Sequence, residues 1–198
     1  MARNIAVASG GNSVLIVQNS DIYRVTRSVK IPVFAQHMDP VGNGKFTGRD
    51  VARTLKENGA SGILINHSED RQKMKDIKSS INICKKEKMM SLVCAAKPSE
   101  ISMIARMKPH IVAIEPPKLI GTGIPVSKAE PWIVRDSVRA VKRSHKRVTV
   151  LCGAGISTGD DVRAAIELGC HGVLAASAIM QARQPKKIMK EFISALPR

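Results

Sequence analysis

Short apolar runs alternate with longer amphipathic stretches along almost the whole chain. The runs are nearly wholly apolar, which is typical of strands that are covered on both faces. They predict seven strands, centred near residues 15, 33, 64, 92, 113, 150 and 174. The expected bounds are residues 14–17, 31–36, 62–65, 90–94, 111–114, 148–152 and 172–176.

Between these runs, apolar residues recur at the spacing of one helix face. The expected helices cover residues 2–9, 21–29, 49–58, 99–107, 158–169 and 185–196, a stretch carrying Met74, Ile77, Ile81 and Cys84, and a stretch carrying Val134, Val138 and Val141. Thr158 and Asp161 have the spacing that caps the start of a helix. Residues 118–128 carry no such pattern and are expected to form a long loop.

The order of these elements predicts the fold class. Strands that alternate with helices at this spacing favour an α/β protein with a parallel sheet. Because the chain starts with a helix that no strand precedes, it fits a TIM (β/α)8 barrel that lacks its first strand, as one N-terminally incomplete domain over residues 1–198. A doubly wound open sheet is the alternative that periodicity leaves open.

Composition narrows the class of protein. With 43% hydrophobic residues the chain can bury a core, and no apolar run is long enough to span a membrane. No secretory signal precedes the first helix. The four cysteines, Cys84, Cys94, Cys152 and Cys170, lack CxxC spacing, and we interpret them as buried thiols of a cytoplasmic protein without a metal site or disulfides.

The formal net charge of +16 is unusual for a chain of this size. It is compatible with nucleic-acid contact or with attraction of an anionic metabolite. However, most basic residues lie on the polar faces of helical stretches, as in residues 71–88 and 135–147. One Trp, one Tyr and three Phe are too few for a base-stacking platform. We therefore interpret the charge as solvated surface and expect no nucleic-acid partner.

Unusual residues follow three of the predicted strands, at the edge where parallel β/α folds hold their active sites. His67 follows one strand, Glu115 follows another, and Gly153-Ala154-Gly155 follows a third. A glycine turn before a helix binds anions through bare amides and the helix dipole. A carboxylate, an imidazole and an anion cradle together predict proton transfer on a phosphorylated carbonyl compound.

Five segments at these positions resemble archaeal-type triosephosphate isomerase, in order and at compatible spacing. They are AQHMDPVGNGKFTG (35–48), INHSEDR (65–71), AIEPPKLIGTGIPVSKAEP (113–131), VLCGAGISTGDDV (150–162) and GVLAASA (172–178). The resemblance extends over nearly the whole chain. It implies interconversion of glyceraldehyde 3-phosphate and dihydroxyacetone phosphate through an enediolate, a step of glycolysis and gluconeogenesis.

The resemblance also implies roles for individual residues. Glu115 would be the base that moves the proton, and His67 the neutral electrophile that polarises the carbonyl. Glu69 resembles the family's supporting carboxylate. Residues 118–123 resemble the lid over the substrate, with Ile120 and Gly121 as its contacts.

Further implications concern the phosphate and the assembly. The backbone at Gly155, Ala176 and Ser177 would hold the phosphate, with no metal and no cofactor. The loop at residues 39–48 resembles one that inserts into a neighbouring subunit, which implies a homodimer or homotetramer.

One departure from the family pattern affects the expected activity. The family begins with a strand that ends in Asn-x-Lys, whose lysine assists the developing oxyanion, and no such strand precedes the first expected helix. Lys45 lies in the loop that resembles the family's subunit-contact loop and is no obvious substitute. An upstream start, a natural short form and an inactive homologue with a basic RNA-binding surface are the competing explanations. Another sugar-phosphate isomerase or epimerase on the same scaffold is a further alternative.

Overall fold

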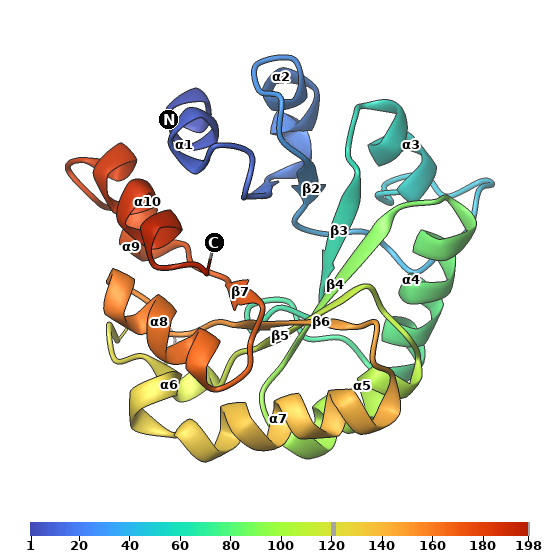
Figure 1. Ribbon diagram of the computed structural model, residues 1–198. Coiled ribbons are helices and arrows are strands. Elements are labelled where there is room, and N and C mark those ends of the chain that lie inside the picture. Colours follow the sequence, from blue (N-terminus) through green and yellow to red (C-terminus); the bar gives the residue numbers. More distant parts are fainter. Residues whose placement is uncertain (120–121, 198) are drawn as a thin grey trace.

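The computed structural model describes residues 1–119 and 122–197. In these residues, seven strands form one curved parallel sheet in sequence order (Figure 1). The strands are β1 (Leu15–Val17), β2 (Val33–Ala35), β3 (Gly62–Ile65), β4 (Met90–Ala95), β5 (Ile111–Ile114), β6 (Thr149–Cys152) and β7 (Gly172–Val173). All seven predicted strands are present. The sequential order overturns the doubly wound alternative, in which the strand order would reverse.

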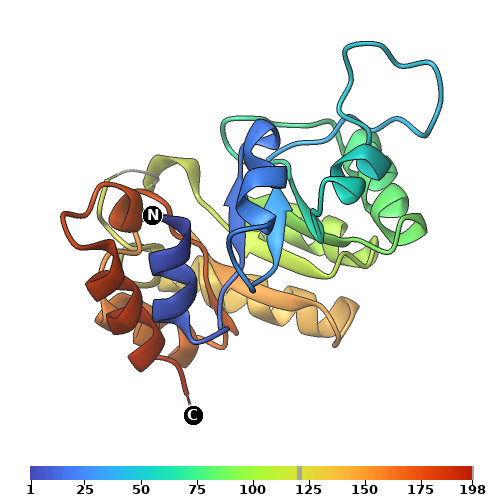
Figure 2. The ribbon, with the colours of Figure 1, turned by 90° about the horizontal axis from the view of Figure 1, so that it is seen from above.

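The helices cover the convex face of the sheet (Figure 1). They are α1 (Ala2–Ser9), α2 (Ile22–Thr26), α3 (Ala52–Glu57), α4 (Met74–Lys86), α5 (Pro98–Arg106), α6 (Val126–Ala129), α7 (Pro131–Ser144), α8 (Gly159–Glu167), α9 (Ser177–Met180) and α10 (Pro185–Ser194), with single 3₁₀ turns at Asn19–Asp21 and Pro117–Leu119. Figure 2 shows α1 beside α10, where the two ends of the chain pack together. No helix of the described residues is long and apolar enough to cross a membrane.

Apolar side chains form two separate layers. The larger layer fills the space between the sheet and the helices and contains Ile63, Val93 and Ile114. The smaller layer lies inside the curve of the sheet and is built from Phe34, Leu64, Leu92, Cys94, Ile111 and Ala113. Burial on both faces explains why the central strands are almost wholly apolar.

The sheet is less well covered at its two ends. In the described residues, β1 pairs with β2 alone and β7 with β6 alone. Both strands are only half-buried, whereas β2, β3 and β5 are buried throughout. Ile16 and Leu174, which extend the inner layer toward these ends, are correspondingly half-buried. Packing density therefore falls from the centre of the sheet to its edges.

Two predicted elements need correction. The loop expected at residues 118–128 ends in helix α6, because Pro125 sets an extended N-cap and Val126 is fully buried. The strand expected at residues 172–176 ends at Val173, since Ala176 is already the N-cap of α9. Both errors occur in short segments, where tertiary packing rather than the local sequence determines the secondary structure.

The helix expected at residues 21–29 is also shorter than predicted. It ends at Thr26, whose hydroxyl donates to the carbonyl oxygens of Tyr23 and Asn58. Local side-chain bonds of this kind compete with helix continuation. By contrast, the capping box of Thr158 and Asp161 is present as predicted.

A contact in the inner layer gives a stability prediction. A Cβ added at Gly62 would lie 2.6 Å from the fully buried Phe34 ring. Gly62→Ala should therefore lower the free energy of unfolding, measured by urea denaturation, by about 1–3 kcal/mol. Gly42→Ala is the matched control, because nothing lies within 4 Å of its Cβ position. Equal midpoints for both variants would contradict this account of the core.

Candidate active site

The site begins with Asn66, which directly follows strand β3 and adopts the left-handed conformation (φ 63°). Its side chain is buried, and its amide donates to the carbonyl oxygen of Cys94 (2.8 Å). The backbone N–H of Gln72 donates to the Asn66 side-chain oxygen (3.0 Å). Asparagine tolerates this backbone conformation better than most residues do. Asn66 thus fixes the turn that carries the next residue, His67.

A buried carboxylate extends this network. Glu100, on α5, accepts from the backbone N–H of Ala96 (2.8 Å), from the Asn66 amide (3.4 Å) and from the Arg71 guanidinium. Because its carboxylate has several donors, Glu100 can be buried at low cost. The network ties the ends of β3 and β4 to the start of α5.

His67 lies between two carboxylates. Its Nε2 is 3.8 Å from Glu115 Oε2, and its Nδ1 is 3.6 Å from Glu69 Oε2. The backbone N–H of Glu69 points at Nδ1 from 3.4 Å, which requires a lone pair on that nitrogen. The Glu69 side chain is 86% exposed, so water screens its charge and the backbone contact decides the tautomer. With Nδ1 as the acceptor of this N–H, a proton on Nε2 faces Glu115.

Glu115 is a buried carboxylate with an unpaired oxygen. Its N–H continues the sheet by donating to the Ala95 carbonyl (2.8 Å), and this bond places its side chain at the tip of β5. Oε2 has no hydrogen-bond partner in the described residues. Burial raises the pKa of Glu115, while the Cys94 thiol and His67 oppose part of that rise. A carboxylate in this state is a stronger base than an exposed one.

Gly153 makes the room that this carboxylate occupies. A Cβ at position 153 would lie 2.5 Å from Glu115 Cγ and 2.8 Å from Oε1. The N–H of Gly153 donates to the Ile114 carbonyl (2.9 Å), so β5 and β6 hold the two residues against each other. Gly153 therefore provides space for the Glu115 carboxylate in addition to forming the first residue of the turn.

The other side of the same turn borders a hollow of about 330 Å³. Gly155 and Ser177 both line it, together with Thr122, Gly123 and Gln181. Ser177 begins α9, where the first helical N–H groups have no intrahelical acceptor. Ala176 is the N-cap before it and does not itself line the hollow. Ile120 and Gly121 lie outside the described residues.

The segment that begins at residue 122 is held against the turn formed by Gly153, Ala154 and Gly155. Gly155 (φ 73°) approaches the backbone so closely that a Cβ would fall 1.9 Å from the Ile124 oxygen. The Lys128 ammonium lies 2.7 Å from the buried Asp161 carboxylate. Although burial acts in the opposite direction, hydrogen bonds from Lys128, Ser157 and Thr158 hold the pKa of Asp161 below its usual value.

The structure brings His67, Glu69 and Glu115 together, and it puts Gly155 and Ser177 beside one hollow. Sequence reasoning missed the supporting residues Asn66 and Glu100, and it assigned Gly153 to the anion-binding turn alone. Asn66 stands next to His67 in the sequence, and an asparagine at a strand end is a signal for a left-handed turn. Glu100 could not be found in this way, because its partners are remote in sequence.

The arrangement can move a proton next to an anionic group. A partly desolvated carboxylate, an imidazole and a hollow beside the glycine turn lie together at the carboxyl ends of the strands. Among the described residues, no cluster of three or more His, Cys, Asp and Glu side chains could hold a metal ion.

Comparison with known proteins identifies the family. The family model for triosephosphate isomerase matches residues 2–192. The chain is 48% identical to the triosephosphate isomerase of Methanobrevibacter smithii over 99% of its own length and 90% of that protein. It is 46% identical to that of Methanothermobacter thermautotrophicus over 96% of the chain and 83% of the relative. For Methanocaldococcus jannaschii the identity is 44%, with 98% and 88% covered.

The chain belongs to the triosephosphate isomerase family. The family is one of isomerases with the TIM-barrel fold, so the sequence-based expectations of fold, reaction class and archaeal-type relationship are confirmed. Membership also favours the triosephosphate isomerase interpretation over the other interpretations that the sequence left open.

The contact between Gly153 and Glu115 gives a prediction for this triosephosphate isomerase family member. Gly153→Ala should displace the carboxylate and lower kcat by about 10²-fold, because small misplacements of a reacting group have large effects on rate. The change in kcat is measured as turnover of triose phosphate, and thermal unfolding curves show whether the variant is folded. Glu167→Gln, which changes an exposed side chain on α8 outside the site, is the control. Unchanged kcat in Gly153→Ala would show that the carboxylate does not need this space.

Proposed function

We propose that the chain interconverts D-glyceraldehyde 3-phosphate and dihydroxyacetone phosphate through an enediolate, with Glu115 as base and His67 as electrophile. The observation that carries the proposal is the 3.8 Å approach of His67 Nε2 to Glu115 Oε2 beside the glycine turn. The family supports the reaction class, and the geometry supports the assignment of the two groups.

Glu115 would remove the proton from one substrate carbon and return it to the neighbouring carbon. Two features support this role. Its Oε2 has no competing hydrogen-bond donor among the described residues, and burial raises its pKa toward the range in which a carboxylate is an effective base. The space over Gly153 keeps the side chain at the tip of β5.

His67 would polarise the substrate carbonyl and pass protons between its two oxygens. With Nδ1 accepting from the Glu69 N–H, the Nε2–H is the donor that faces the reacting region. A neutral imidazole as electrophile beside a glutamate base is the established division of labour in triosephosphate isomerases. Glu69 would support His67 from the solvent side, where its carboxylate lies 3.6 Å from Nδ1.

The phosphate would bind in the hollow beside Gly155. Backbone N–H groups at Gly155 and at the start of α9, with Ala176 and Ser177, are the proposed donors, because helix starts and glycine turns favour anions. Residues 118–123 would close over the substrate, with Ile120 and Gly121 as contacts. Closure would exclude water from the enediolate and protect it from loss of phosphate. The Lys128–Asp161 pair would anchor the far end of this lid.

We further propose that the chain forms a homodimer or homotetramer in the cytoplasm and needs no cofactor. The loop at residues 39–48 would contact the neighbouring subunit. It is exposed over residues 42–48, and its base is held by Asp39, which accepts from Arg49 (2.9 Å) and from the Asp50 N–H (2.8 Å). A loop that is held at its base and carries the exposed Phe46 suits insertion into a partner.

Turnover of triose phosphate tests the proposal directly. The purified chain should interconvert the two triose phosphates. Glu115→Gln should lower kcat by about 10²–10⁴-fold, since it removes a general base. His67→Gln should lower kcat by about 10²–10³-fold, since it removes an electrostatic group. Glu167→Gln changes an exposed carboxylate on α8 and serves as the control.

Three outcomes would overturn this assignment. A parent chain with no turnover above background would contradict the reaction for this polypeptide. Parent rates in the Glu115 and His67 variants would contradict the named roles. Faster turnover of pentose phosphates than of triose phosphates would indicate a different sugar-phosphate isomerase or epimerase.

The raised pKa of Glu115 predicts a pH dependence. The base acts only when ionised, so kcat/KM should fall with decreasing pH at a higher pH than an ordinary glutamate would give. Cys94→Ala removes a hydrogen bond that favours the ionised form, and it should shift this acid limb to still higher pH. Cys94→Ser, which retains a donor, should shift it less. Cys84→Ala, a buried thiol elsewhere in the core, should leave the limb unchanged.

A further inference from the structure

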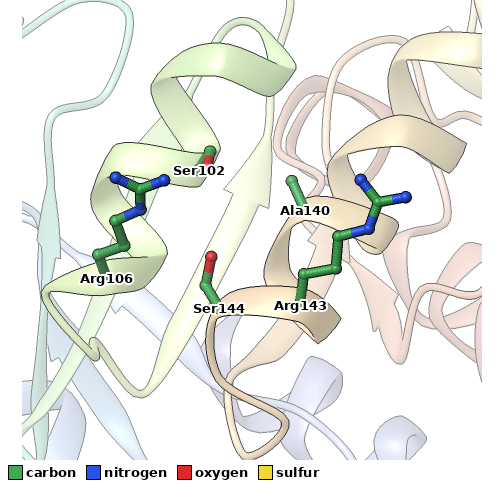
Figure 3. A pocket seen from close by; sticks show the side chains of 5 residues that line it. All are labelled: Ser102, Arg106, Ala140, Arg143 and Ser144. Atoms are coloured by element: carbon green, nitrogen blue, oxygen red, sulfur yellow. The ribbon is translucent and has the colours of Figure 1, made fainter.

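A second hollow lies on the outer layer of helices, between α5 and α7. Its volume is about 470 Å³, and its lining residues are Ser102, Arg106, Ala140, Arg143 and Ser144. Figure 3 shows the small side chains in the middle, with one arginine on each side. The small residues form a floor, and the two guanidinium groups flank it. None of these residues belongs to the candidate active site.

The charge around this hollow is predominantly positive. Residues 102–108 and 131–147 contain one acidic residue, Asp136, against eight basic ones. The basic residues are Arg106, Lys108, Arg135, Arg139, Lys142, Arg143, Lys146 and Arg147. Asp136 lies 3.6 Å from Arg139, and none of the other seven has an ion pair within the described residues.

The positively charged surface extends to the end of α4. Lys85 donates to the Met107 carbonyl (2.8 Å). Partial burial, and then the charge of Lys108, lower the pKa of Lys85. Two ammonium groups thus lie close enough to repel each other beside the end of α5, with no carboxylate pair for either among the described residues.

The basic residues of α7 form a row. Arg135, Arg139 and Arg143 follow one another at intervals of four residues, so they lie on one face of the helix at steps of about 6 Å. A compact anion would contact one or two such groups. A row of cations beside a hollow instead suits a linear polyanion.

This surface is remote from the reaction proposed above. Arg106 and Ser144 end α5 and α7, shortly before β5 and β6 begin. His67 and Glu115 follow the opposite, carboxyl ends of their strands. The surface can therefore bind a ligand without blocking the candidate active site.

We propose that the α5–α7 surface binds the phosphate backbone of a nucleic acid. Guanidinium groups match the geometry of phosphate oxygens, and the hydroxyls of Ser102 and Ser144 are further phosphate donors. The chain has only five aromatic residues, so recognition rests on phosphates and shows little base preference. The floor of the hollow is serine and alanine, and the exposed apolar side chains on these two helices are Met103 and Trp132, so the charge of the surface is its dominant feature. This proposal replaces the interpretation of the same residues as solvated surface alone.

Fluorescence anisotropy with a labelled single-stranded poly-uridylate of about 20 nucleotides tests the proposal, with salt varied from about 50 to 200 mM. The parent should bind with an affinity that falls steeply with salt. The triple variant Arg106→Gln, Arg139→Gln, Arg143→Gln should bind at least about tenfold more weakly, and its log–log salt slope should be smaller by about 2, or about 0.7 per lost phosphate contact.

The control removes the same charge from another surface. Lys186, Lys187 and Lys190 are exposed on α10, and their triple Gln variant should keep nearly the parent affinity and slope. Thermal unfolding curves establish that both variants are folded.

The proposal fails under any of three results. One is the absence of salt-dependent RNA binding by the parent. Another is equal weakening in the α5–α7 and α10 variants, which would mean that net charge alone is responsible. The third is binding to phosphatidylserine vesicles without binding to RNA.

Discussion

The burial of the Glu115 carboxylate is the constraint on which the rest of the site depends. A buried carboxylate with an unpaired oxygen is unfavourable, and it persists only where the surroundings over-determine its position. The sheet register supplies that position, since the pairing of β4, β5 and β6 holds the tips carrying Cys94, Glu115 and Gly153 side by side. The missing Cβ of Gly153 supplies the space. The pairing of the strands therefore holds the carboxylate in the buried position that makes it a strong base.

The other buried carboxylates near this base, unlike Glu115, have several hydrogen-bond donors. Glu100 and Asp161 are buried, yet each carboxylate has several donors. One satisfied network fixes the turn before His67, and the other fixes the segment after the proposed lid to the glycine turn. Fully satisfied buried networks are rigid. The result is a pre-organised frame around the Glu115 carboxylate, whose Oε2 has no hydrogen-bond partner among the described residues.

The seven strands and most of the helices could be predicted, because apolar periodicity and burial on both faces leave a strong local signal. The site tips could be located because parallel strands carry their chemistry at one edge, so His67 and Glu115 were found from position and residue type. Gly153 was assigned only to anion binding, since its contact with Glu115 depends on strand register. Helix α6 was missed because four residues, held mainly by the burial of Val126, leave almost no periodic pattern.

The graded packing of the sheet separates the two halves of the site. His67 and Glu115 follow β3 and β5, which are buried throughout, whereas Ser177 follows β7, a half-buried edge strand. Local opening is easiest where buried apolar contacts are few. We therefore expect slower amide exchange in the strands that carry the acid–base groups than in the β7–α9 region, which carries Ser177 of the proposed phosphate site. A bound phosphate would accordingly protect the β7–α9 region from exchange more than it protects the strands that carry the proton-transfer groups.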